Sequence, residues 1–447
     1  MAIATEAERE EWRAGTVVSP DREQAHFGAG FPPAADLSID EINPLNPHLF
    51  REDRWHDYFA RLRREDPVHL NELGSAGRYW SVTKWADVRG VESDDKTFCS
   101  AHGITIGPPA DTDMPPTTPL DSFITMDAPE HRRQRRTVQP MMAPTNLRNL
   151  ESLIRERATR VLDSLPEGET FDWVDTVSVE LTTLMLATLF DFPLEDRSKL
   201  TRWSDLVTTI PSPDGIVETS AQRREEFSDC LPYFERLWEE RRANPGNDMI
   251  SMLVHGEATS HMGAAAHLGN LILLIVGGND TTRNTMSGSV YALNKYPDQY
   301  DKLNANPELI ATFVPEIIRW QTPLAYMRRT ATADCEIGGR QIRKDEQVLM
   351  WYISANRDEE IFGEDADDLD IERHNADRHL SFGYGFHYCL GSRLAELQLR
   401  VLWEEILPRF ERIEIQAEPQ RSLSSFIHGY THLPVRVTRK QPRRLLD

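Results

Sequence analysis

The chain has 447 residues, of which 39% are apolar, and its formal net charge is −22. This composition is typical of a globular protein with a large core, and the strong negative charge argues against nucleic-acid binding. Apolar runs stay well below the roughly 18 to 20 residues that a membrane span needs, so we expect no integral membrane anchor. The four cysteines, Cys99, Cys230, Cys335 and Cys389, are far apart, which indicates reduced thiols in a cytoplasmic protein.

The N-terminal part predicts a polar arm and then a small mixed region. Residues 1–45 are polar and aperiodic, and we expect an extended or loosely ordered arm ahead of one domain spanning 46–447. Helical periodicity follows over 46–65, then an alternating pattern typical of a hairpin over 68–70 and 79–82, then a short helix over 85–91. Residues 99–124 hold five prolines and predict a long loop, which inside a compact domain is often functional.

A basic helix follows this loop. Asp127 is predicted to cap it, with Pro129 and Glu130 in the first turn. His131 and Arg135 are four residues apart and therefore share a helix face. Such a pair can bind a carboxylate, although a charged stripe on a helix is most often only solvated.

The middle of the chain is helical. Several helices are predicted over 146–245, with breaks near Pro193, at 211–213 and at 245–246, and core packing explains most of their apolar residues. One long helix is predicted over 263–295 and contains Gly277-Gly278-Asn279-Asp280-Thr281-Thr282. Two interior glycines cost about 1 kcal/mol each relative to alanine, and Thr hydroxyls bond back to carbonyls. We expect a weakened hydrogen-bond ladder that opens a groove; the alternative is a tight helix crossing at the glycine pair.

The C-terminal third begins with a helix over 307–321, in which Glu316 and Arg319 are three residues apart and face each other. Strands are predicted at 335–337, 341–342 and 347–352, with turns at 338–339 and 344–345, and again at 412–415 and 433–437. The chain is therefore expected to be mainly α with a smaller β region.

The most informative stretch is 382–391, which reads F-G-x-G-x-H-x-C-x-G. Glycines on both sides of Tyr384 allow positive φ and close approach to a flat ligand. A helix is predicted over 390–407, so Cys389 lies at its N-terminus, where the dipole favours a thiolate. An isolated cysteine is commonly an inert buried thiol, but a single thiolate beneath a glycine-rich loop suits the axial ligand of a haem iron.

Together these motifs resemble the cytochrome P-450 superfamily of haem-thiolate monooxygenases, from about residue 46 to the C-terminus. The segments 276–284 and 379–406 look most like the bacterial alkane and fatty-acid terminal hydroxylases. The resemblance implies the cytochrome P-450 fold, in which haem b lies between the long distal helix and the Cys loop with its proximal helix.

The resemblance also implies roles for individual residues. Cys389 would ligate the iron, with Phe382, Gly383 and Gly391 beside it, and the propionates would be held by His131, Arg135, His387 and Arg329, with Arg328 as a competing choice to Arg329. Asp280 and Thr281 would relay protons to bound O2, and Glu316, Arg319 and Arg373 would form a structural ion-pair triad. Expected substrate contacts are Leu206, Val207, Ile210, Gly277 and Leu324.

The implied reaction inserts one oxygen atom of O2 into a C–H bond of a small apolar substrate. Electrons are expected from a ferredoxin and its reductase, because the chain has neither a flavin-binding motif nor a four-cysteine iron–sulfur motif. Tyr388 stands where many relatives carry Arg, which leaves the preference for a partner open.

Four alternatives remain at this level. In the first, the substrate is a terpene or an aromatic compound. In the second, the protein is a peroxide-driven peroxygenase, a class whose members lack the acid–alcohol pair found here as Asp280 and Thr281. A haem sensor would need no proton relay. A zinc site at His387 and Cys389 has too few further ligands nearby.

Overall fold

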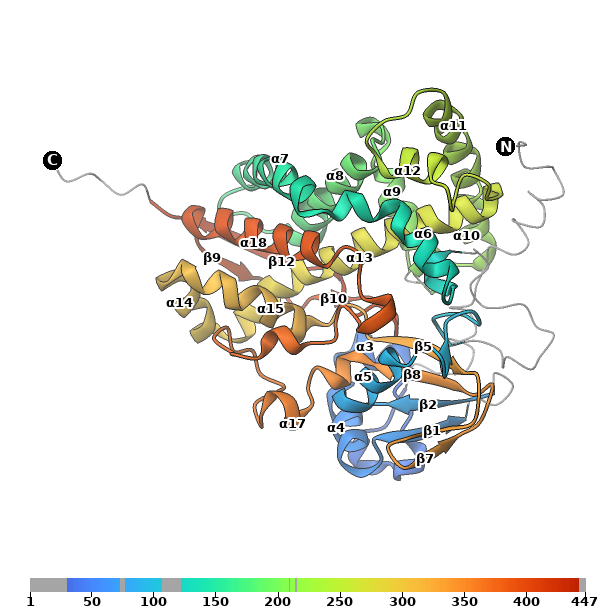
Figure 1. The fold of residues 1–447 in the computed structure, drawn as a ribbon. Coiled ribbons are helices and arrows are strands. Elements are labelled where there is room, and N and C mark those ends of the chain that lie inside the picture. Colours follow the sequence, from blue (N-terminus) through green and yellow to red (C-terminus); the bar gives the residue numbers. More distant parts are fainter. Residues whose placement is uncertain (1–29, 73–76, 107–121, 209, 214, 442–447) are drawn as a thin grey trace.

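The computed structural model describes residues 30–72, 77–106, 122–208, 210–213 and 215–441. The protein is mainly helical with a smaller β region, as predicted, and the long helix α13 runs through the helical part (Figure 1). The helices are α3 (Pro47–Arg51), α4 (His56–Glu65), α5 (Trp85–Ser93), α6 (Glu130–Val138), α7 (Pro144–Asp163), α8 (Glu180–Leu189), α9 (Ser198–Thr208), α10 (Ser220–Phe227), α11 (Cys230–Ala243), α12 (Met249–His255), α13 (Ala264–Lys295), α14 (Pro297–Ala305), α15 (Ile310–Gln321), α16 (Tyr352–Ala355), α17 (Glu359–Phe362) and α18 (Ser392–Arg409).

The β region lies in two places: β1, β2, β5 and β8 lie together to one side of the helical part, and β9 and β12 lie beside α18 (Figure 1). Its main sheet has five strands in the order β1-β2-β8-β5-β3, with β2 and β8 parallel and the other neighbours antiparallel. A second sheet has the order β4-β12-β9, and β6-β7 and β10-β11 form two-stranded pairs. The strands are β1 (Val68–Glu72), β2 (Arg78–Val82), β3 (Phe98–Cys99), β4 (Phe171–Asp172), β5 (Tyr326–Ala331), β6 (Cys335–Ile337), β7 (Arg340–Ile342), β8 (Gln347–Trp351), β9 (Phe410–Ile415), β10 (Gln420–Arg421), β11 (Tyr430–His432) and β12 (Pro434–Arg439).

The predicted hairpin over 68–70 and 79–82 is confirmed, and so are the strands on either side of the predicted turn at 338–339. β1 pairs with β2 from Val68 opposite Val82 to Glu72 opposite Arg78. β6 pairs with β7, and the glycines in its turn, Gly338 and Gly339, have φ of +54° and +80°, a conformation that glycine adopts without steric cost.

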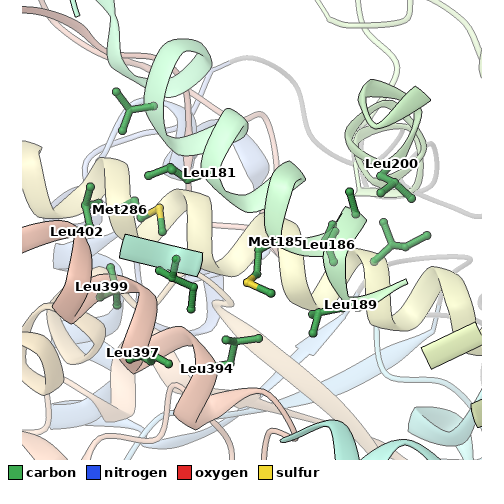
Figure 2. Packing of buried hydrophobic residues seen from close by; sticks show 14 of the residues in the cluster. Leu181, Met185, Leu186, Leu189, Leu200, Met286, Leu394, Leu397, Leu399 and Leu402 are labelled. Carbon is green, nitrogen blue, oxygen red and sulfur yellow. The ribbon is translucent and has the colours of Figure 1, made fainter. Parts of the chain in front are cut away.

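The main core lies between α8, α13 and α18 (Figure 2). Leu181, Met185, Leu186 and Leu189 recur at helical spacing on α8, and Figure 2 shows them beside Met286 of α13 and the leucines of α18. Because this cluster packs α13 and α18 into one unit, it fixes how these two helices lie relative to each other. In the described part of the chain, no helix is both long and apolar enough to cross a bilayer.

The prediction of a loosely ordered arm is wrong for residues 30–45. Ile42 and Leu45 are completely buried in a cluster with α4 and β8, and the Tyr58 hydroxyl donates to the carbonyl of Pro32 at 2.7 Å. Burial of these apolar side chains offsets the cost of ordering the segment. Residues 1–29 lie outside the described residues.

Two predicted helix starts also differ. The pattern over 46–65 forms two helices, α3 and α4, with Asp53 at a φ of +54° between them. Helix α6 begins at Glu130 without a side-chain cap. The Asp127 carboxylate instead accepts a hydrogen bond from the backbone N–H of Ser100 at 2.7 Å, so it joins the segment after β3 to the start of α6. Residues 107–121 of the predicted long loop lie outside the described residues.

Candidate functional site

The Cys389 loop is closed on itself and packed against α5. The backbone N–H of Cys389 donates to the carbonyl of Phe382 at 2.8 Å. Gly383 and Gly385 have φ of +67° and +64°, as the motif predicts. A Cβ on Gly385 would lie 2.7 Å from the carbonyl oxygen of Glu92, so only glycine fits there. The loop then leads into α18, whose first residue, Ser392, is three positions after Cys389.

The charge of the Cys389 sulfur depends on two opposing effects. Burial raises the pKa of the thiol above its ordinary value, while hydrogen bonding from the backbone N–H groups of Gly391 and Ser392, together with the charge of Arg135, acts in the opposite direction. The helix end acts in the predicted direction, since the N–H groups of Gly391 and Ser392 lower the pKa, but burial of the sulfur opposes this effect and is larger. A cation bound at the sulfur is needed to keep it ionised, as in metal–thiolate sites.

Four nitrogen-bearing side chains gather beside this loop: His131 and Arg135 from α6, Arg329 from β5 and His387 from the loop itself. The rings of His131 and His387 have centroids 4.2 Å apart, and the Nδ1 atom of each is buried without a hydrogen-bond partner. Burial, reinforced by the charges of Arg135, Arg132 and Arg329, lowers the pKa of His131 to about 4. Burial and the charge of Arg329 also lower the pKa of His387 well below its ordinary value. Unpaired buried donors next to two arginines fit a ligand that brings negative charge.

The structure separates the two candidate arginines on β5. Arg328 donates to the backbone carbonyls of His102 and Thr105 and so holds the segment after β3. Arg329 forms an ion pair with Glu92 at 3.0 Å, and its charge acts on both His131 and His387. Arg329, not Arg328, therefore belongs to the cationic group.

The two glycines of α13 have different surroundings. A Cβ on Gly277 would meet nothing within 4 Å, whereas on Gly278 it would lie 2.8 Å from Leu186 of α8. Gly277 therefore faces open space, whereas Gly278 lies at a close crossing with α8, where an added Cβ would make the Leu186 side chain move. The weakened ladder expected at the glycine pair does not interrupt the helix, since α13 is continuous from Ala264 to Lys295. The Thr281 hydroxyl donates to the Gly277 carbonyl at 3.0 Å and supplements the helix instead of interrupting it.

Asp280 lies on another side of α13, where it is completely buried. Its Oδ2 accepts from the Ser204 hydroxyl at 3.0 Å, and its Oδ1 lies 2.5 Å from Nη2 of Arg283. The same Nη2 lies 2.5 Å from Oδ1 of Asp205 on α9. Burial raises the pKa of Asp280; Arg283 opposes this shift and Asp205 adds to it. These four residues form a buried polar clasp, named here the α9 clasp, between α13 and α9.

The three residues predicted to form an ion-pair triad lie together in the interior. Nε of Arg319 is 2.7 Å from Glu316, and Nε of Arg373 is 3.2 Å from it. Arg319 also donates to the backbone carbonyls of Asn356, Ala366 and Asp368. The triad thus fixes the irregular chain between α16 and the Cys389 loop.

The expected substrate contacts divide into two groups. Leu206 and Ile210 are almost completely buried, so they belong to packed regions and do not face open space. Val207 is 39% exposed and Gly277 is open, while Leu324 is partly buried and forms a bridge with Ile427.

Three residues that the sequence analysis missed complete the site: Glu92, which pairs with Arg329, and Ser204 and Asp205, which reach the acid of α13. Arg283 was also missed, but its position three residues after Asp280 is a readable signal. Glu92 and Arg329 are 237 positions apart, and no local pattern connects them.

Comparison with known proteins identifies this arrangement. The profile of the family described as cytochrome P-450 matches residues 111–432. The chain belongs to the cytochrome P-450 family. It is an oxidoreductase, since relatives over most of its length are monooxygenases and hydroxylases.

Three cytochromes P-450 show the extent of this similarity. Linalool 8-monooxygenase of Pseudomonas putida is 36% identical, and the match covers 87% of this chain and 97% of that protein. The methyl-branched lipid omega-hydroxylase of Mycobacterium bovis is 32% identical over 90% of this chain and 96% of its own length. The structure of CYP153D17 from Sphingomonas sp. PAMC 26605 has a TM-score of 0.81 and 48% identity, and covers 90% of this chain and 100% of that one.

The family implies a haem iron, and the residues described above fit one. Cys389 would supply a sulfur ligand, and the buried His131 and His387 nitrogens without partners would form an anion site with the neighbouring Arg135 and Arg329. Gly277 leaves open space on α13. When bound, a haem iron supplies the redox chemistry that activates O2.

Proposed function

We propose that this cytochrome P-450 hydroxylates the terminal carbon of medium-chain alkanes or fatty acids. It would use haem b, O2 and electrons from a ferredoxin and its reductase, in the cytoplasm, where its four free cysteines would stay reduced. The observation that carries the proposal is the similarity, over 90% of the chain, to a lipid omega-hydroxylase. The residues near Gly277 on α13 fit an apolar chain, since Leu273, Leu274 and Val276 are apolar and only partly buried.

In this proposal each part of the site has one task. Cys389 holds the iron, and His131, Arg135, Arg329 and His387 hold the propionates. Thr281, next to the open Gly277, would hold a water molecule that donates a proton on the distal side. Asp280 would replenish that proton, because a carboxyl group whose pKa is raised by burial can carry a proton closer to neutral pH. Val207 and the apolar face of α13 would orient the substrate and exclude water.

The electron donor would dock over the Cys389 loop. Tyr388 is 43% exposed there. Arg132 lies over the ring of Phe386 at 5.1 Å, and Arg89 over that of Tyr384 at 4.5 Å. Cations and exposed aromatic groups on a chain of net charge −22 suit an acidic partner such as a ferredoxin.

A second candidate substrate class is a terpene alcohol, which is favoured by the similarity to linalool 8-monooxygenase over 87% of the chain. A ligand titration of the purified ferric protein separates the two. Alkanes, fatty acids, terpenes and aromatic compounds are added in turn, and a change of spin state marks the ligands that displace iron-bound water. Products are then identified with ferredoxin and reductase present.

We expect the largest spin change with linear chains, and products oxidised at the chain end. A response to linalool but not to linear chains would favour the second candidate. Peroxide alone matching the ferredoxin-supported rate would favour a peroxygenase, and a spin change without any product would favour a sensor.

A further inference from the structure

Glu92 is a buried acid in the last turn of α5, and it has two strong partners. The residue is only 4% exposed. One carboxylate oxygen lies 3.0 Å from Nη2 of Arg329 on β5, and the other accepts a hydrogen bond from the hydroxyl of Tyr352, the first residue of α16. A buried carboxylate held in this way is an unusual group that requires an explanation, since burial of charge is costly without a partner.

The same residue forms part of the bed on which the Cys389 loop lies. A Cβ on Gly383 would be 3.5 Å from the Glu92 carboxylate and 3.8 Å from the Tyr352 hydroxyl, and one on Gly385 would be 2.7 Å from the Glu92 carbonyl. The negative charge of Glu92 therefore lies directly beneath the loop that carries Cys389.

Glu92 also provides a negative charge next to the group formed by His131, Arg135, Arg329 and His387. Arg329 is the member of this group with a carboxylate partner, whereas Arg135 donates to the backbone carbonyl of Tyr388. Nη1 of Arg329 donates to its own chain at the Arg328 carbonyl, 2.9 Å away. Glu92 and this carbonyl together fix the orientation of the Arg329 guanidinium, and the carboxylate neutralises part of the positive charge that the propionates would meet.

We propose that Glu92 is a positioning residue of the haem site, which orients Arg329 toward the propionates and lowers the reduction potential of the iron. The direction follows from Coulomb's law, because a fixed negative charge in a poorly hydrated region disfavours the gain of an electron nearby. The inference rests on the haem site of the proposed function. A purely structural role, in which Glu92 only joins α5 to β5, would affect unfolding but not the potential.

The test is a spectroelectrochemical titration of the intact, haem-loaded, substrate-free protein. Glu92→Gln keeps the size and most hydrogen bonds of the side chain and removes its charge. We expect a higher midpoint potential, so that at a fixed applied potential the ratio of reduced to oxidised protein rises at least about threefold, where tenfold corresponds to 59 mV for one electron. Glu308→Gln, which makes the same change on the exposed Glu308 in the 3-10 turn just before α15, is the matched control and should leave the potential unchanged.

If Glu92→Gln does not retain haem, a double-mutant cycle with Arg329 still tests the proposal. Arg329→Gln should lower the potential, and the double variant Glu92→Gln/Arg329→Gln, which leaves no buried unpaired charge, should lie above Arg329→Gln. A Glu92→Gln potential equal to that of the control, or equal potentials for Arg329→Gln and the double variant, would overturn the proposal. Wild-type protein that takes up no haem would instead overturn the proposed function.

Discussion

Loss of the Cys389 side chain should change the absorption spectrum of the haem-loaded protein. Replacing Cys389 by Ala removes the cysteine of the loop over 382–391, the candidate sulfur ligand of the iron. We expect the red-shifted Soret band of the reduced carbonyl adduct to disappear. The comparison is with Cys335→Ala, which changes a half-buried thiol in the β6–β7 hairpin and should keep the band. A red-shifted band in Cys389→Ala would show that another residue binds the iron.

Thr281 carries a hydroxyl at the place where α13 faces open space. The hydroxyl donates its hydrogen to the Gly277 carbonyl, so its oxygen is oriented to accept a hydrogen bond from a water molecule and hold that water in place. Without it, Thr281→Ala should make more peroxide and less alcohol from the same reductant, with product formation reduced by up to roughly 100-fold, within the range of proton-transfer effects. Thr312→Ala removes a similar back-bonding hydroxyl from the exposed side of α15 and serves as the control. Unchanged yield of alcohol per reductant in Thr281→Ala would exclude the relay.

At the scale of helices, the contact between α13 and α11 contains a buried histidine, His267. The N-terminal part of α13 packs on α11, where His267 is 2% exposed and its ring centroid is 5.2 Å from that of Trp238. Burial, followed by the charge of Arg242, lowers the pKa of His267 from 6.5 to about 4. The helix contact therefore accepts only the neutral ring.

This predicts how stability depends on pH. Above pH 6.5 His267 is neutral in the folded and the unfolded chain, so the full stability is present; as the pH falls from 6.5 toward 4 the unfolded chain gains the proton first, and stability is lost. We expect the free energy of unfolding of His267→Leu to fall less over this pH range than that of the wild type, by up to about 2 to 3 kcal/mol. Denaturant unfolding at pH 7.5 and pH 5 measures it, with His261→Leu at an exposed site as control. Equal losses in His267→Leu and wild type would contradict the prediction.

At the scale of the molecule, the Glu316–Arg319–Arg373 triad joins the helical part to the chain that leads to the Cys389 loop. Arg373→Met leaves the completely buried Glu316 with one cation fewer and removes the donor to the Phe362 and Asp365 carbonyls. We expect a loss of about 3 kcal/mol, as for other broken buried pairs, and lower haem content. Arg340→Met breaks the more exposed pair with Asp66 and should cost at most about 1 kcal/mol. Similar unfolding midpoints for the two variants would show that burial does not matter here.

Local patterns predicted much of this molecule. The long helix was expected at 263–295 and spans Ala264–Lys295, and the strand at 335–337 has the predicted bounds, because periodicity and turn residues act over a few positions. The Cys loop was predictable for the same reason. What failed depends on partners distant in sequence: Asp127 bonds to Ser100 instead of capping its helix, and residues 30–45 are ordered by α4 and β8. Glu92 and Asp205 gave no signal, because their partners come from other elements.

The α9 clasp has a consequence for selectivity. Asp280 and Arg283 on one helix share hydrogen bonds and charge with Ser204 and Asp205 on the other, so the acid keeps its surroundings only while the two helices stay together. A substrate so bulky that it displaces α9 would separate these side chains from one another. Such a substrate would be oxidised poorly even when it binds tightly. The enzyme would then sort compounds by how efficiently electrons are converted into product, a criterion that measured affinities alone do not reveal.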